Sequence, residues 1–262
     1  MRLRAGRRTP ARDDWPARTM PLLEACLNGG RTRDDHPAYP RTREELAADA
    51  RAAVAAGADV LHVHPYDDQG RESLASDGCA LTIDAVRSVC PGIPISLTTT
   101  AAIEPDPERR LELVADWHVL PELVTANQGE PGIVELCEHL LSRGVGIEAG
   151  LLSLEDARSF VAAGIADRCT RVLIEPLDAD PGIAVAHAAE MESIIVAAGI
   201  ELEQVHHGDG IATWAVMRRA LDRGYGTRAG LEDTTVLPDG SQPKDNAELV
   251  RTAAAMITEL SS

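Results

Sequence analysis

The chain has 262 residues, a formal net charge of −17 and 44% hydrophobic residues. This length suits one α/β barrel or two smaller domains, and the acidic charge argues against nucleic acid or an anionic membrane surface as a partner. No apolar run is long enough to predict a membrane-spanning helix. The cysteines are scattered without a Cys-x-x-Cys pair, which indicates reduced thiols and a cytoplasmic protein.

Residues 1–20 differ in composition from the rest of the chain. They carry six arginines and two prolines and show no periodic apolar pattern. We expect a disordered tail, or a true translation start at Met20, followed by a single domain over residues 21–262.

From residue 21 onward, short apolar runs alternate with helical patterns. Thr42 and Glu45 have the spacing of a capping box, and Gly57 ends the helix that they begin. Strands are predicted at 22–27, 59–64, 93–98, 123–126, 145–148, 172–175, 202–206 and 226–231. Helices are predicted at 42–57, 81–89, 107–115, 132–142, 154–163, 183–198, 211–222 and 247–260.

Eight strand–helix units in about 240 residues predict a single-domain (β/α)₈ TIM barrel of the α/β class. The alternative is a doubly wound open sheet, which shows the same alternation and usually has fewer strands. In a barrel, function resides in the loops that follow the strands. The polar residues at these predicted strand ends are Asn28, His62, His64, Thr98, Thr99, Thr100, Thr125, Asn127, Glu130, Glu148, Glu175, His206, His207, Arg228, Glu232 and Asp233.

Two histidines at the end of the second predicted strand are candidate metal ligands. Residues two apart on a strand point the same way, so His62 and His64 share a face. Converging neutral imidazoles suit a divalent metal ion. The alternative is a pair of core histidines held by backbone carbonyl groups.

Two adjacent carboxylates at the end of the last predicted strand could complete this site. In a closed barrel, strands two and eight flank strand one, so Glu232 can approach the histidine pair. Two imidazoles and one carboxylate fit zinc best, with cobalt, manganese or iron as alternatives. Arg228 can pair with Asp233 and hold it ready as a base, or the two residues can form a rim salt bridge.

The chain resembles the β-keto acid cleavage enzyme family, which includes 3-keto-5-aminohexanoate cleavage enzyme. The matching stretches are Asn28-Gly29-Gly30 with Arg31-Thr32 and His36-Pro37; His62-Val63-His64; Gly70-Arg71-Glu72-Ser73-Leu74; Asn127 with Glu130-Pro131-Gly132; Val145-Gly146-Ile147-Glu148-Ala149-Gly150-Leu151; His207-Gly208; and Arg228 to Asp233 with Asn246-Ala247. The His-x-His and Arg-x-Gly-x-Glu-Asp motifs together are specific, and their order and spacing agree.

The resemblance implies a zinc-dependent TIM barrel that condenses a β-keto acid with acetyl-CoA to give acetoacetate and a new acyl-CoA. It also implies a homo-oligomer, a tetramer or a dimer. The residue roles that it implies are metal ligation by His62, His64 and Glu232, general base catalysis by Asp233 with Arg228 as its activating partner, and substrate binding by Thr98, Thr99, Thr125, Asn127 and Arg31.

Three departures from the family pattern surround the expected substrate. Tyr66 stands where many relatives have arginine, and residues 98–101 replace a Ser-Thr-Gly run. Arg31 stands at a position that is acidic in the lysine-fermentation member. We therefore expect a keto acid whose side chain is anionic or neutral, without an amino group.

Two other functional classes fit parts of the pattern. A metal-dependent hydrolase of the amidohydrolase type also uses His-x-His in a barrel, but usually on strand one. A non-catalytic barrel that binds a metabolite or a metal is the third interpretation, and the altered threonine stretch is the feature that supports it.

Overall fold

The computed structural model describes residues 20–260 and shows one closed barrel of parallel strands, numbered in chain order around the ring. The predicted TIM barrel is confirmed, whereas the predicted tail at residues 1–20 lies almost wholly outside the described residues. The strands are β1 (Leu23–Cys26), β2 (Val60–Val63), β3 (Ile95–Thr98), β4 (Leu123–Asn127), β5 (Gly146–Leu151), β6 (Arg171–Ile174), β7 (Glu203–His206) and β8 (Gly226–Ala229).

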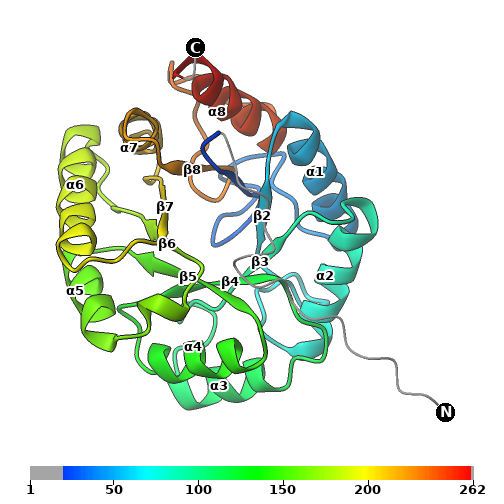
Figure 1. The fold of residues 1–262 in the computed structure, drawn as a ribbon. Coiled ribbons are helices and arrows are strands. Elements are labelled where there is room, and N and C mark those ends of the chain that lie inside the picture. Colours follow the sequence, from blue (N-terminus) through cyan, green and yellow to red (C-terminus); the bar gives the residue numbers. More distant parts are fainter. Residues whose placement is uncertain (1–19, 261–262) are drawn as a thin grey trace.

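Helices form an outer ring around these strands (Figure 1). They are α1 (Arg43–Ala56), α2 (Ser76–Val89), α3 (Pro107–Ala115), α4 (Ile133–Ser142), α5 (Leu154–Ala163), α6 (Pro181–Ala197), α7 (Ala212–Asp222) and α8 (Asn246–Leu260). A short 3₁₀ helix, Ala166–Arg168, precedes β6. Over residues 20–260, none of the helices combines the length and the apolar character that crossing a membrane requires.

The predicted ends of α1 are confirmed. The Thr42 hydroxyl accepts a hydrogen bond from Glu45 N at 3.2 Å, and the Glu45 carboxylate accepts one from Thr42 N at 3.1 Å. Gly57 ends the helix at φ 119°, a left-handed conformation that favours glycine. Since each helix returns the chain to the start of the next strand, these helix ends fix where β2 begins.

The two faces of the barrel wall differ in character. Side chains alternate across each strand, so every strand supplies both faces. The outward side chains, such as Leu61, Ile147 and Val172, pack with the helices in one large apolar cluster. A separate small cluster of Leu22, Val60, Leu123, Leu173 and Val205 lies inside the wall. The other inward positions are mainly polar.

Candidate metal centre and catalytic base

Three side chains converge at the mouth of the barrel. His62 Nε2 lies 3.6 Å from Glu232 Oε2, and His64 Nε2 lies 3.3 Å from Glu232 Oε1. The three ligand atoms lie within 4.8 Å of one another. His62 lies on β2, His64 directly follows that strand, and Glu232 lies in the turn after β8, three residues beyond the strand's last residue. The three residues that the sequence pattern predicts as ligands therefore meet at one point.

The other ring nitrogen of each histidine is held by a neighbour. His64 Nδ1 lies 2.5 Å from Glu72 Oε1. His62 Nδ1 lies 3.3 Å from the Thr125 hydroxyl and 3.4 Å from the Ser96 hydroxyl. Outer partners of this kind fix the ring orientation of metal-binding histidines, and they leave both Nε2 atoms facing Glu232.

The two histidines differ in protonation. Burial, with Arg228 nearby, holds the pKa of His62 well below its ordinary value, so its imidazole is neutral and able to bind a metal. Burial also lowers the pKa of His64, but Glu232 and Glu72 outweigh it and raise this pKa to about 9. The carboxylates around His64 thus favour positive charge at this point, whether from a proton or from a metal ion.

Asp233 lies beside this cluster, buried and enclosed by donors. Arg228 Nη2 donates to Oδ1 at 2.6 Å, Arg228 Nε lies 3.3 Å from Oδ2, and Cys26 Sγ donates to Oδ2 at 2.6 Å. His207 Nδ1 lies 3.7 Å from Oδ1. Burial raises the pKa of Asp233, but Arg228 and His207 outweigh it and hold the pKa below its ordinary value. The carboxylate is therefore ionised at neutral pH.

The site is built where the first and last strands meet. A Cβ atom at Gly230 would lie 1.8 Å from the Cys26 carbonyl oxygen, and one at Gly29 would lie 2.7 Å from Glu232 Cγ. Glycine at both positions is what lets the ends of β1 and β8 approach. Asn246 fastens them further, because it donates to Leu27 O at 2.7 Å and accepts from Leu231 N at 2.6 Å.

Deeper in the barrel, Arg171 forms a buried charged group with two carboxylates. Its Nη1 lies 3.2 Å from Glu148 Oε1 and 4.0 Å from Glu24 Oε2, and all three side chains are fully buried. Burial and the nearby Glu148 raise the pKa of Glu24 well above its ordinary value. Glu148 also accepts a hydrogen bond from Ser96. This group therefore supports the floor of the site beneath His62.

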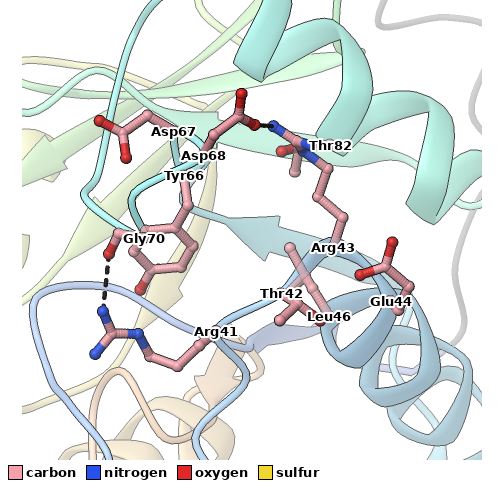
Figure 2. Close-up of a pocket in the computed structure, with 10 residues that line it drawn as sticks. All are labelled: Arg41, Thr42, Arg43, Glu44, Leu46, Tyr66, Asp67, Asp68, Gly70 and Thr82. Carbon is pink, nitrogen blue, oxygen red and sulfur yellow. Dashed lines mark hydrogen bonds and ion pairs between the residues drawn. The ribbon is translucent and has the colours of Figure 1, made fainter.

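A pocket of about 400 Å³ opens beside the loop after β2, between that loop and the start of α1 (Figure 2). The Arg41 guanidinium lies over the Tyr66 ring at 5.9 Å and donates to Gly70 O. A guanidinium group is thus present beside position 66, contributed by a different residue from the one the family pattern leads us to expect. Three lining carboxylates outnumber the two lining arginines, so the pocket is not a concentrated anion site.

A family model described as beta-keto acid cleavage enzyme matches residues 22–262. The chain belongs to the β-keto acid cleavage enzyme family. Among curated relatives of this family, 3-keto-5-aminohexanoate cleavage enzyme of Fusobacterium nucleatum is 25% identical over 91% of this chain and 92% of its own. The protein of that name from Acetoanaerobium sticklandii is 24% identical over the same shares. Membership supports cleavage of a β-keto acid as the general kind of reaction.

Solved structures agree with the fold of this family member. A complex of ObcA with oxaloacetate superimposes with a TM-score of 0.66 at 16% identity, over 86% of this chain and 65% of that one. The chain therefore spans slightly less than two thirds of that protein. The 3-dehydroquinate dehydratase of Geobacillus kaustophilus gives a TM-score of 0.60 at 13% identity, over 95% of both chains. At these identities the likeness concerns the barrel alone.

The substrate-binding residues that the family resemblance implies differ in the direction and the contacts of their side chains. Thr98 and Thr125 are buried, and their positions alternate with outward-facing residues, so both face the barrel interior. Thr99 instead donates its hydroxyl proton to Thr125 O at 2.9 Å. Arg31 bonds to Glu232 O, Asp233 O and Asp209 Oδ1, at 2.8, 3.0 and 2.7 Å, so it supports the turn that carries the two carboxylates.

Several residues near the site were not predicted from the sequence of this family member. The sequence pattern indicates no contact for Cys26 or Glu72. Nor does it separate His206, which stacks on Tyr225 with ring centroids 4.8 Å apart, from His207, whose Nε2 lies 3.4 Å from Glu175 Oε2. Strand alternation places His206 and His207 on opposite faces of β7, but the residues before them do not show which face points inward.

Proposed function

We propose that this chain is a metal-dependent enzyme that condenses a β-keto acid with acetyl-CoA, giving acetoacetate and a new acyl-CoA. The observation that carries the proposal is the meeting of two imidazoles and the Glu232 carboxylate beside the ionised, buried Asp233. Family membership supports β-keto acids as the substrate class.

His62, His64 and Glu232 would hold the metal ion, and zinc suits this set of donors best, with Co²⁺ or Mn²⁺ as alternatives. The fit has structural support, because Glu232 Oε2 is buried and has no hydrogen-bond partner within residues 20–260. A bound ion would satisfy this oxygen. When bound, it would polarise the keto group and stabilise enolate charge.

The chain's own residues supply the proton chemistry. Asp233 accepts a proton from the methylene carbon between the keto group and the carboxylate, while Arg228 holds the Asp233 carboxylate in place. The carbanion attacks the acetyl carbonyl, so a carbon–carbon bond forms and the CoA thiolate leaves. The thiolate then attacks the original keto carbon, and the bond between that carbon and the methylene carbon breaks. The departing acetoacetate carbanion takes its proton back from Asp233.

The substrate is held from the neighbouring strand ends in this proposal. Thr98 ends β3, Asn127 ends β4 and Thr125 lies two residues before that end; all three would contact the β-keto acid. Thr99 would act indirectly, because its hydroxyl donates to Thr125 O and holds that part of β4 in place. Arg31 lies at the same mouth, and its positive charge favours a keto acid whose side chain is anionic or neutral over one that carries an ammonium group.

An assay with purified protein, acetyl-CoA and a panel of β-keto acids tests the proposal, with acetoacetate as the readout. Activity should stop with a chelator and return with zinc. Glu232→Gln should lose bound metal and at least about 10³-fold in rate, since a Lewis acid contributes several kcal/mol. Asp233→Asn should lose rate and keep its metal. Acetoacetate formation that a chelator leaves unchanged would overturn the metal-dependent mechanism.

A further inference from the structure

Glu130, in the turn after β4, connects two loops at the mouth of the barrel. Its Oε1 atom accepts three hydrogen bonds: from Asn127 Nδ2 at 3.1 Å, from the Thr100 hydroxyl at 3.1 Å and from Ala101 N at 2.9 Å. Two of these donors belong to the loop after β3, and the third belongs to the last residue of β4. One carboxylate oxygen therefore fixes both strand ends relative to each other.

Arg110 fixes the other oxygen from outside the barrel. This α3 residue is fully buried, and its Nη1 lies 3.3 Å from Glu130 Oε2. Its Nη2 donates to Pro131 O at 2.5 Å. A buried guanidinium requires a paired carboxylate, because an unpaired buried charge carries a large free-energy cost. The packing of α3 therefore holds the Glu130 carboxylate in place through Arg110.

The hydrogen bond to Glu130 also sets the orientation of the Asn127 side-chain amide. Its nitrogen faces Glu130, while its Oδ1 lies 2.5 Å from the place where a Gly150 Cβ atom would be. Gly150 alternates with Ile147 and Ala149 of the outer cluster, so this place lies on the inner face of the wall. In the part of the chain that the structure describes, Asn127 Oδ1 accepts no hydrogen bond from protein. Glu130 thereby holds a free acceptor toward the mouth.

We infer that Glu130, supported by Arg110, is a positioning residue for the β-keto acid: it sets the Asn127 amide and the residue 99–101 loop against the substrate. The inference rests on the proposed function, and it adds a residue that contacts neither the metal ligands nor Asp233. It assigns to the Glu130-Pro131-Gly132 stretch a role in substrate affinity rather than in proton transfer.

Glu122 provides a matched control at the opposite end of the same two strands. Its carboxylate accepts from Ile95 N at 3.1 Å and from Arg87 Nη2 at 2.7 Å, so it joins the starts of β3 and β4 as Glu130 joins their ends. Glu122→Ala and Glu130→Ala each remove a carboxylate that joins β3 to β4 and pairs with an arginine, and only Glu130 lies at the mouth.

The test compares these two variants with wild type by steady-state kinetics and by hydrogen–deuterium exchange. Glu130→Ala should raise KM for the β-keto acid about tenfold, change kcat less, leave KM for acetyl-CoA and bound metal unchanged, and speed exchange in residues 99–104. Glu130→Gln, which keeps an acceptor oxygen, should recover part of the affinity. Glu122→Ala should show none of these changes in KM.

Equal KM values for Glu130→Ala and Glu122→Ala would overturn the inference. If Glu130→Ala does not fold, Thr100→Val replaces it, because it removes one donor from a half-buried side chain; an unchanged KM in that variant would overturn the inference in the same way. If the wild-type enzyme cleaves no β-keto acid, the proposed function fails. The exchange of residues 99–104 then still decides whether Glu130 fixes the loop.

Discussion

The outer and inner faces of the barrel wall are made by the same strands and have opposite chemistry. On β2, the outward Leu61 and Val63 belong to the large apolar cluster, whereas His62, with His64 directly after the strand, points inward to Glu232. The outer face needs only matching shape and volume, which apolar side chains of many kinds supply. The inner face carries buried polar groups that destabilise the fold unless each has a partner.

This difference shows how one strand supplies both stability and chemistry. Parallel strands are usually apolar on both faces, because both faces are covered. Here five buried apolar residues form the inner cluster, and charged or polar residues occupy much of the remaining interior. We therefore expect outward substitutions to change the free energy of unfolding, and inward ones near the mouth to change activity.

We expect Arg171 to be an exception to this division, because it faces inward and yet contributes to the free energy of unfolding. Replacing it in Arg171→Met leaves the fully buried Glu148 without the guanidinium group that lies 3.2 Å from its carboxylate. We expect a loss of about 3–5 kcal/mol in the free energy of unfolding, measured by urea denaturation. Adding Glu148→Gln should recover part of it. A loss below about 1 kcal/mol would show that the carboxylates do not depend on Arg171.

Ile147→Ala sharpens the comparison from the outer side. Ile147 lies on β5, one residue before Glu148, and it is fully buried in the outer cluster. The cavity left by the lost side chain should cost about 2–4 kcal/mol in the free energy of unfolding. At a temperature where the variant is folded, kcat and KM should match wild type. A large fall in kcat at that temperature would show that the two faces are not independent.

Asp49 on α1 is a polar exception in the helical layer, and its effect depends on pH. Burial raises its pKa to about 6, although the hydrogen bond from Asn246 Nδ2 at 2.6 Å acts in the opposite direction. Because the folded-state pKa exceeds the unfolded value, the folded state binds the proton more tightly. Stability should therefore fall as pH rises from about 4 to about 6 and remain lower above that.

Asp49→Asn removes this dependence and keeps an oxygen that can accept from Asn246. Its advantage over wild type should grow with pH across that interval and reach about 1–2 kcal/mol above pH 6. Urea denaturation at pH 4 and pH 7.5 measures it. A difference between variant and wild type that is the same at both pH values would contradict the assigned pKa.

The order of elements was predictable because it depends on local patterns. Alternating apolar runs marked all eight strands, and the Thr42–Glu45 capping box and Gly57 marked the first helix. The start of α2 was missed by five residues, since the helix begins at Ser76 rather than at residue 81. The residue before it, Ala75, makes no side-chain capping bond, so the sequence carries no signal at that point.

The candidate site was predictable only as far as residues two apart on a strand or near each other in sequence. The inward direction of His62 and His64 follows from strand alternation. The bond from Cys26 to Asp233 joins residues 207 positions apart, and periodicity carries no information about such a contact. The end of β7 at His206 was predicted correctly, but alternation alone does not show whether His206 or His207 faces the interior.

The joining of β1 to β8 has a consequence for the order of events during synthesis. Both imidazoles of the proposed metal centre are translated in the first quarter of the chain, while Glu232 and Asp233 follow 168 or more residues later. A nascent chain on the ribosome therefore carries half of the centre long before the other half exists. Tight binding of a metal ion would therefore occur only after the last strand has been translated and the barrel has closed.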